Sequence, residues 1–142
     1  PSMRPYHFWT YLLTNYNRTV LYTGMTNDLA TRLVEHWIGK EGSFTTRYGV
    51  HYLVWSEETR YVNNAIAREK EIKRWHRAQK QALIAEQNPN WRFLNADVLG
   101  NWPPTPEQEE AVKTRWREVG EAALMNDRLS FLRQVSDYRS PS

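Results

Sequence analysis

The chain has 142 residues, of which 40% are hydrophobic and 25% are charged, a composition typical of one globular domain with or without an appendage. The absence of cysteine from the sequence excludes a disulfide framework, thiolate zinc sites, iron–sulfur clusters and thiol nucleophiles. The net charge is +3, no run of residues approaches the apolar length of a membrane span, and the N-terminus lacks a signal-peptide pattern, so we expect a soluble cytoplasmic protein without a membrane partner.

The first part of the chain predicts a β-hairpin followed by a helix. Residues His7–Thr14 and Val20–Thr23 are rich in aromatic and β-branched side chains, and the polar residues between them are typical of a turn. Thr26 or Asn27 is suited to cap a helix that reaches Ile38, because apolar positions recur every four residues before a glycine.

The middle of the chain predicts one more strand and two helices. After a loop over 43–48, the apolar run Val50–Ser56 indicates a strand. Apolar spacing predicts a helix over Val62–Trp75. A second helix, Arg77–Gln87, ends before an Asn-Pro step, because the residue before a proline resists the helical conformation. The short run Trp91–Leu94 fits a strand or a coil.

The sequence changes character after residue 100, and we predict a domain boundary there. Residues 1–100 carry 13 Lys and Arg against 9 Asp and Glu, whereas residues 101–142 carry 6 against 7. Trp102–Pro104 indicates a linker, and Thr105 with Gln108 has the spacing of a capping box at a helix start. We therefore expect a linker and a helical C-terminal extension that can be separated from the first domain.

The predicted helices after residue 62 also concentrate positive charge. Six cations fall close together beside two anions, which is a modest signal for nucleic-acid binding; the alternative is a solvated helix face. We expect these cations, together with Asn88, to contact nucleic acid. The six residues are Arg68, Lys70, Lys73, Arg74, Arg77 and Lys80.

Five polar side chains form a pattern suited to phosphodiester chemistry. Two tyrosines lie in the predicted hairpin strands, and an arginine and a histidine share one face of the next helix because they are four residues apart. A glutamate lies within the apolar stripe of the later helix, so it points toward the core. These residues are Tyr11, Tyr22, Arg32, His36 and Glu69.

The motifs around these residues resemble the signature of the GIY-YIG endonuclease family, particularly its small single-domain bacterial members. The resemblance covers residues 6–95 and implies a small α/β sandwich, with a three-stranded antiparallel sheet and flanking helices. In the first two triplets the family residues are replaced at Trp9, Thr10 and Thr23. The motifs read Trp9-Thr10-Tyr11, Tyr22-Thr23-Gly24, Arg32-x-x-x-His36 and Ala67-Arg68-Glu69-x-x-Ile72-Lys73-x-Trp75, followed by Asn88-Pro89.

Hydrolysis of a phosphodiester requires an activated water, a cation that offsets charge on the phosphorus oxygens, and stabilisation of the leaving alkoxide. Glu69 can hold one Mg²⁺ or Mn²⁺, and Arg32 can pair with the phosphate through its planar fork. Tyr11 is our first choice as proton acceptor and Tyr22 for positioning phosphate or water, provided that a metal or Arg32 lowers a phenol pKa near 10. His36 ordinarily titrates near neutral pH, so it can relay a proton or orient a phosphate.

Each of these residues also has a structural interpretation. Strand tyrosines usually belong to the core, and Arg32 with His36 can form a solvated helix face in which Asp28 pairs with the arginine. A buried Glu69 needs a partner, which a salt bridge to an arginine would supply.

We therefore expect a metal-dependent endonuclease that hydrolyses DNA by a one-metal mechanism. The alternative is a nucleic-acid-binding module that has the same fold and does not cleave. A third interpretation is an interaction protein whose amphipathic segment Glu121–Val135 pairs with a second copy of the chain. The sequence favours neither DNA over RNA nor one DNA structure over another.

Overall fold

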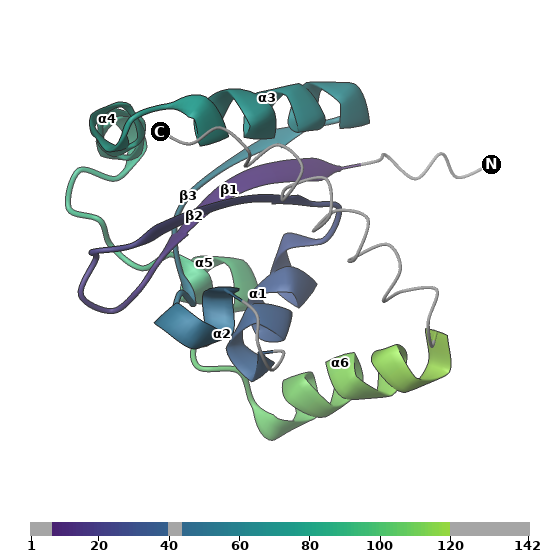
Figure 1. Cartoon of the computed structure of the whole chain (residues 1–142). Coiled ribbons are helices and arrows are strands. Elements are labelled where there is room, and N and C mark those ends of the chain that lie inside the picture. Colours follow the sequence, from purple (N-terminus) through teal and green to yellow (C-terminus); the bar gives the residue numbers. More distant parts are fainter. Residues whose placement is uncertain (1–6, 40–43, 120–142) are drawn as a thin grey trace.

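The computed structural model describes residues 7–39 and 44–119. Within these residues, three antiparallel strands form one sheet in the order β2-β1-β3, as Figure 1 shows. The predicted α/β class with a three-stranded antiparallel sheet is confirmed. The strands are β1 (Phe8–Thr14), β2 (Leu21–Thr26) and β3 (Tyr52–Thr59).

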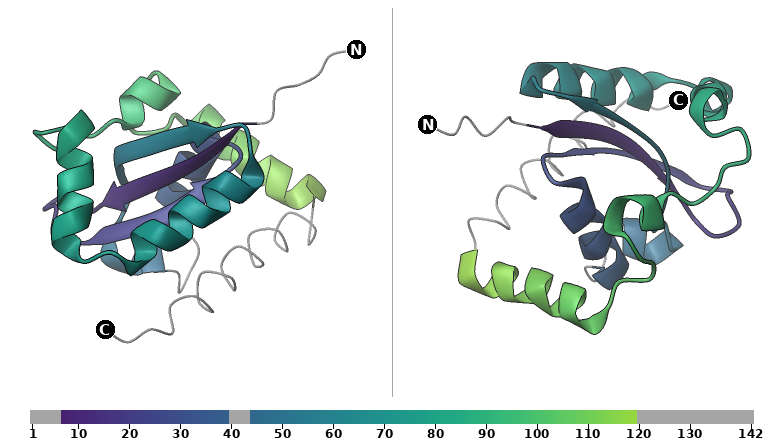
Figure 2. Two further views of the ribbon diagram at one scale, coloured as in Figure 1. Left: turned by 90° about the horizontal axis from the view of Figure 1, so that it is seen from above. Right: turned by 180° about the vertical axis from the view of Figure 1, so that it is seen from behind.

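Helices cover both faces of the sheet. In Figures 1 and 2, α3 and α4 lie on one side, whereas α1, α2, α5 and α6 lie on the other. The described helices are α1 (Leu29–Ile38), α2 (Phe44–Tyr48), α3 (Val62–Arg74), α4 (Arg77–Gln87), α5 (Asn95–Leu99) and α6 (Pro106–Val119). None of them is long and apolar enough to cross a membrane.

The central strand β1 contributes side chains to two hydrophobic clusters, one on each face of the sheet. Tyr11 and Leu13 join Leu33 in the cluster beneath α1, whereas Leu12 joins Ile72 in the cluster beneath α3 and α4. Successive side chains of a strand point to opposite faces, so a strand covered on both faces is buried along its length. This burial makes β1 a rigid base for Tyr11.

The first helix begins at a different residue from the one predicted. Asp28, and neither Thr26 nor Asn27, caps α1: its Oδ1 accepts a hydrogen bond from the Thr31 backbone N–H at 3.1 Å. Thr26 lies at the end of β2, and its hydroxyl accepts from the Asp28 backbone N–H at 3.1 Å. Strand β2 therefore continues to Thr26, beyond the predicted end at Thr23. The N-cap of α1 is accordingly Asp28.

Four boundaries or elements differ from the sequence-based prediction. The predicted loop over 43–48 contains the short helix α2, and the third strand begins at Tyr52 rather than Val50 and continues to Thr59. Residues 91–94 are coil, tied to the sheet by a 2.8 Å hydrogen bond from the Leu94 N–H to the Leu53 carbonyl, and they lead into the unpredicted α5. Helices α3 and α4 lie within the predicted ranges.

Residues between 101 and 119 pack against the first helix. Trp102, predicted to lie in a linker, contacts the core beside α1, with its ring 5.4 Å from that of Trp37. The capping box at the start of α6 is confirmed, because the Gln108 N–H donates to Thr105 Oγ1 at 3.1 Å and the Thr105 N–H donates to Gln108 Oε1 at 2.8 Å. The predicted helix over 121–135 lies outside the described residues.

Candidate active site

The β1–β2 ladder places the first tyrosine opposite a glycine. Tyr11 pairs with Gly24 across the two strands, and the Tyr11 side chain is buried. A Cβ at Gly24 would lie 2.5 Å from both Cζ and the hydroxyl oxygen of Tyr11, which no side chain tolerates. Glycine is thus required by the close approach of the phenol ring.

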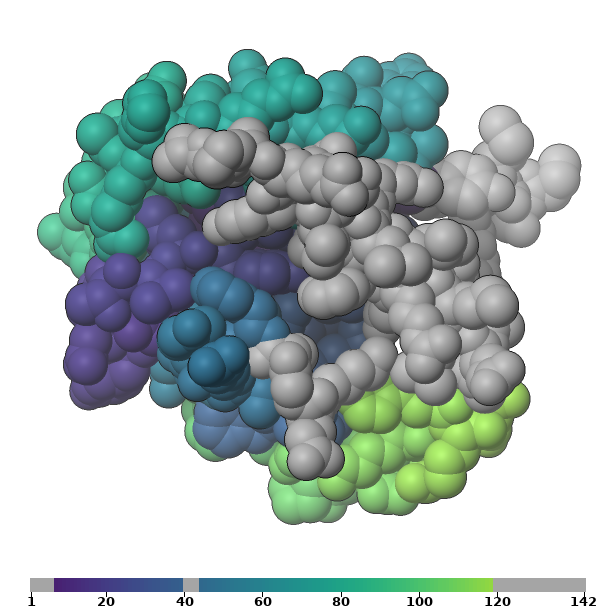
Figure 3. Space-filling view, in the orientation of Figure 1, coloured from purple at the N-terminus to yellow at the C-terminus, as the bar shows by residue number. Residues whose placement is uncertain are grey.

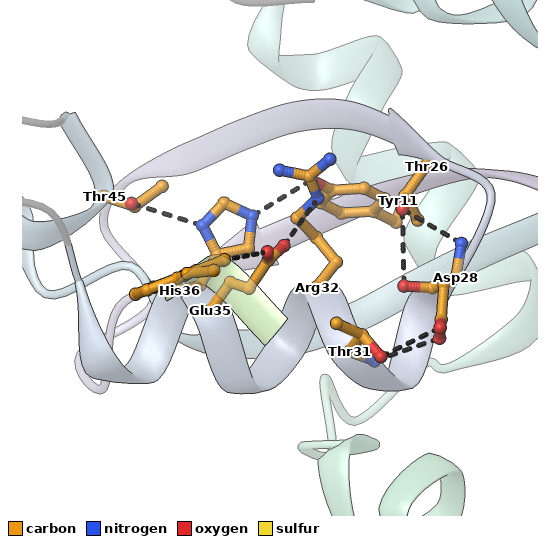
Figure 4. Close-up of polar contacts among 9 residues, drawn as sticks. Tyr11, Thr26, Asp28, Thr31, Arg32, Glu35, His36 and Thr45 are labelled. Atoms are coloured by element: carbon orange, nitrogen blue, oxygen red, sulfur yellow. Dashed lines mark hydrogen bonds and ion pairs between the residues drawn. The ribbon is translucent and has the colours of Figure 1, made fainter. Parts of the chain in front are cut away.

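His36 on α1 meets the hydroxyl of Tyr11. Its Nε2 lies 3.0 Å from that oxygen, and its Nδ1 lies 3.2 Å from the hydroxyl of Thr45 on α2, as Figure 4 shows. A neutral imidazole carries one donor and one acceptor, so either tautomer satisfies both contacts. The ring is therefore held from both sides.

The charge state of His36 differs from the prediction. Burial, the positive charge of Arg32 and the neighbouring His51 lower the pKa of His36 to about 3. The predicted titration near neutral pH is therefore wrong, because an imidazolium in this site would lose its hydration next to a guanidinium. A neutral His36 can orient Tyr11 and accept a hydrogen bond, without carrying a charge at neutral pH.

Tyr11 keeps its proton in this site. Burial raises the pKa of Tyr11 well above its usual value, and Tyr22 raises it further; the lowering effect of Arg32 does not outweigh these two. Tyr11 was predicted to accept a proton only if its surroundings lower the pKa of its phenol. The protein groups around it raise that pKa instead.

Tyr22 occupies a more accessible position between strand and helix. It is half-buried, its ring lies 6.4 Å from that of Tyr11 and 5.6 Å from that of His36, and it stacks on Phe44 of α2 at 6.0 Å. Of the two predicted tyrosines, Tyr22 is therefore the one that a bound molecule can reach.

Arg32 pairs with a residue other than the predicted one. Its Nε lies 3.5 Å from Glu35 Oε1, one turn along α1, whereas Asp28 is engaged in capping the helix. Because Arg32 influences the pKa values of both Tyr11 and His36, its charge lies close to the tyrosine–histidine pair. Figure 4 shows the guanidinium beside that pair.

Glu69 points inward from α3, as the sequence predicts. Its side chain is 4% exposed, and its Oε2 lies 3.7 Å from the ammonium of Lys73, whose side chain is 9% exposed. The structural interpretation named an arginine as partner; the observed partner is a lysine one helical turn away. Glu69 also raises the pKa of Tyr11, so its carboxylate lies within electrostatic range of that hydroxyl.

The donor chemistry of this region fits a hard cation such as Mg²⁺ or Mn²⁺. In the described ranges 7–39 and 44–119, no three His, Asp or Glu side chains converge to form a protein cage for a metal. Magnesium is commonly bound by one or two carboxylates, with waters and substrate phosphates as its other ligands. Glu69 supplies one such carboxylate.

The six cations predicted to contact nucleic acid lie in different surroundings. Arg68 pairs with Glu57 at 3.1 Å and Glu71 at 2.7 Å. Lys73 turns toward Glu69, whereas the half-buried Lys70 and the exposed Arg74 are four residues apart and share another flank of α3. The six cations therefore do not form one face, because residues two apart on a helix point in different directions.

The cations of α4 and the Asn88 side chain have structural contacts. The Arg77 guanidinium donates to the carbonyls of Thr19 at 3.0 Å and Arg18 at 3.1 Å, in the β1–β2 turn. Lys80 is half-buried, and burial together with Arg77 lowers its pKa. Asn88 is buried and donates to the Val54 carbonyl at 3.0 Å, which ties the end of α4 to β3. These positions give no support to a nucleic-acid contact by Asn88.

Two residues of this region were missed by the sequence analysis. Thr45 was assigned to a loop, because five residues without apolar periodicity do not indicate a helix. Glu35 carries no distinguishing pattern, and its contact with Trp116 at 2.8 Å joins residues 81 positions apart. Only the packing of α2 and α6 against α1 reveals them.

Part of the chain matches a known protein family. A family model described as the GIY-YIG catalytic domain matches residues 7–82. The chain is 33% identical over 78 residues to a UPF0213 protein of Vibrio parahaemolyticus, a match that covers 55% of this chain and 73% of the relative. It is 34% identical over 79 residues to a UPF0213 protein of Natronomonas pharaonis, covering 56% and 92%. No solved structure matches significantly. Because the family model spans more than half of the chain and includes every motif tyrosine, the arginine, the histidine and the glutamate, the chain belongs to the GIY-YIG family.

Proposed function

We propose that this protein is a metal-dependent endonuclease that hydrolyses DNA phosphodiester bonds with one metal ion. The observation that supports the proposal is the cluster of Tyr11, Tyr22, His36 and Arg32, with the inward-facing Glu69 within electrostatic range of the Tyr11 hydroxyl, in a chain of the GIY-YIG family. Each of these groups by itself also fits a stable core, and their occurrence together favours a nuclease.

Arg32 is proposed to bind the scissile phosphate. Its planar guanidinium matches two phosphate oxygens and keeps its charge at any physiological pH. The ion pair with Glu35 orients the side chain before substrate arrives, which lowers the entropy cost of binding. A bound phosphate would thus meet a guanidinium already held beside Tyr11 and His36.

Tyr22 is proposed to take the proton-handling role that the sequence analysis gave to Tyr11. Tyr22 is half-buried and reachable, whereas Tyr11 is buried and its pKa is raised. Tyr11 and His36 then act as a rigid, uncharged support that fixes the ring of Tyr22 from one side.

Glu69 is proposed to hold Mg²⁺ or Mn²⁺, which when bound would offset negative charge on the phosphate oxygens. The ammonium of Lys73 lies 3.7 Å from Glu69 Oε2 and offsets the charge of the buried carboxylate.

The test is a nicking assay with labelled DNA in Mg²⁺, Mn²⁺ or EDTA. Cleavage is expected with either metal and is expected to disappear with EDTA. Glu69→Gln should abolish cleavage and weaken Mn²⁺ binding measured by calorimetry. Lys73→Gln is the matched control, because it breaks the same ion pair and leaves the carboxylate in place. Equal loss of Mn²⁺ binding in both variants, or cutting by Glu69→Gln, would contradict the metal-ligand role.

A non-cleaving nucleic-acid-binding module remains the second candidate. The Glu69–Lys73 pair favours it, because an ammonium beside a buried carboxylate stabilises that carboxylate without a metal ion. Binding of DNA without metal-dependent cutting, at any metal concentration, would select this function over the first.

A further inference from the structure

The short helix α2 presents two aromatic rings to solvent beside the candidate active site. Phe44 is 40% exposed and Tyr48 is 47% exposed, and their ring centroids lie 4.8 Å apart. They are four residues apart and therefore share one face of the helix. Two adjoining exposed aromatic rings are typical of a surface that binds a ligand or a macromolecule.

A run of rings connects this surface to the site. The ring of Tyr22 lies 5.6 Å from that of His36 and stacks on Phe44, with 27° between the planes and 6.0 Å between the centroids. Phe44 in turn contacts Tyr48. Figure 3 shows α2 in blue at the surface, next to the purple β1–β2 hairpin that carries Tyr22.

The opposite face of α2 anchors the helix to the same site. Thr45 is buried, and its hydroxyl lies 3.2 Å from Nδ1 of His36. The position of the exposed rings is thus fixed relative to the groups proposed to handle the phosphate. A nucleotide whose phosphate reaches Arg32 and Tyr22 would find Phe44 as the adjoining apolar surface.

The charge of α2 suits a polyanion. Its sequence, Phe-Thr-Thr-Arg-Tyr, contains no acidic residue, and the exposed Arg47 places its guanidinium 5.6 Å from the ring centre of Tyr48. Aromatic rings and guanidinium planes are the groups on which nucleobases stack, and the cation attracts the adjoining phosphates.

We propose that Phe44 and Tyr48 form a stacking platform for an unpaired nucleobase next to the scissile phosphate, so that the preferred substrate is single-stranded DNA or DNA with an unpaired segment. This inference rests on the proposed function, because it takes the phosphate site from it. A base within a duplex is already stacked on both faces and must be unstacked before it can reach such a platform. An unpaired base carries no such cost.

Metal-free binding separates this inference from cleavage. In EDTA, the affinity of the full chain is measured by fluorescence anisotropy for three labelled ligands: a single strand, the corresponding duplex, and a strand of abasic sites with the same number of phosphates. The variants are Phe44→Ala and Tyr48→Ala, with Phe44→Tyr as the ring-retaining substitution. Tyr16→Ala and Tyr61→Ala are the matched controls, because both are exposed aromatic residues on other elements.

We expect the single strand to bind more tightly than the duplex and the abasic strand. Phe44→Ala is expected to weaken single-strand binding about tenfold, a typical effect of removing one stacking ring, and to leave abasic binding unchanged. Phe44→Tyr, Tyr16→Ala and Tyr61→Ala are expected to bind like the parent. Thermal melting checks that Phe44→Ala is folded.

Several results would overturn the platform. Unchanged single-strand binding by Phe44→Ala and Tyr48→Ala would do so, and so would equal losses for the base-containing and abasic strands. A change of molecular mass in Phe44→Ala, measured by light scattering, would show that the rings join two copies of the chain instead. Base-dependent binding without any metal-dependent cutting would support the platform while contradicting the proposed nuclease function.

Discussion

Trp116, near the end of α6, donates its indole N–H to Glu35 Oε2 at 2.8 Å, while the other oxygen of Glu35 faces Arg32 at 3.5 Å. A residue outside the matched range 7–82 thereby contacts the carboxylate that orients the proposed phosphate-binding arginine. The separability of residues 101–142 stays a prediction, and this contact gives a reason to test whether removing them changes the site as well as the stability.

Trp116→Phe removes the indole N–H and keeps an aromatic ring. We expect it to lower kcat/KM for DNA cleavage about tenfold, because a hydrogen bond to a charged group contributes about 1.5–3 kcal/mol and here it fixes Glu35. Arg117→Gln is the control on the same helix, since it breaks an exposed pair with Glu110. A lower melting temperature with unchanged cleavage would assign α6 a purely structural role.

The depressed pKa of His36 predicts a specific dependence of stability on pH. The unfolded chain binds a proton on this histidine below about pH 6.5, whereas the folded protein does not until the pH approaches 3. The stabilisation is therefore complete above pH 6.5 and falls by about 1.4 kcal/mol for each pH unit below it. Urea unfolding at pH 7, 5 and 4 measures this slope, and His36→Gln should reduce it. An imidazole that titrates near pH 6.5 in NMR spectra of the folded protein would contradict the assignment.

Gly24→Ala tests the close packing between the two hairpin strands. The added Cβ would overlap the ring and hydroxyl of Tyr11, so we expect a loss of about 1–3 kcal/mol in the free energy of unfolding. In a Tyr11→Leu background, the same substitution should cost less, because the opposing ring is absent. Equal costs in the two backgrounds would place the clash elsewhere.

The two tyrosine hydroxyls are expected to act differently. Tyr22→Phe should slow the chemical step about 10²-fold with little change in melting temperature, because its hydroxyl is proposed to handle the proton. Tyr11→Phe leaves a nitrogen of the buried His36 without the Tyr11 hydroxyl, so we expect it to lower the free energy of unfolding by about 1–3 kcal/mol. Single-turnover rates and melting curves on both variants separate the roles. Near-normal rates in Tyr22→Phe would exclude the proposed assignment.

The flank of α3 that carries Lys70 and Arg74 is expected to contribute to DNA affinity. Neutralising both to Gln should weaken binding to all sequences and reduce the salt dependence of the affinity, by about one unit of log–log slope for each lost phosphate contact. Arg92→Gln is the control, because this exposed arginine lies outside α3 and pairs with Asp97. A salt dependence equal to that of the parent would place the DNA on another surface.

Local sequence determined the elements whose signals are short in range. Helix α4 ends where the Asn-Pro step predicts, and the spacing of Thr105 and Gln108 predicts the capping box of α6. Both signals depend on neighbours within one helical turn. The inward direction of Glu69 followed from helical periodicity for the same reason. The family motifs likewise indicate the candidate site residues from the sequence.

Tertiary structure alone decided the chemistry of those residues. The pKa of His36 depends on burial and on Arg32, the partner of Glu69 proved to be Lys73, and α2 forms where no periodic pattern predicts it. Charge state and ion pairing are set by desolvation and by distances between groups brought together from separate elements, quantities that spacing along a chain does not contain.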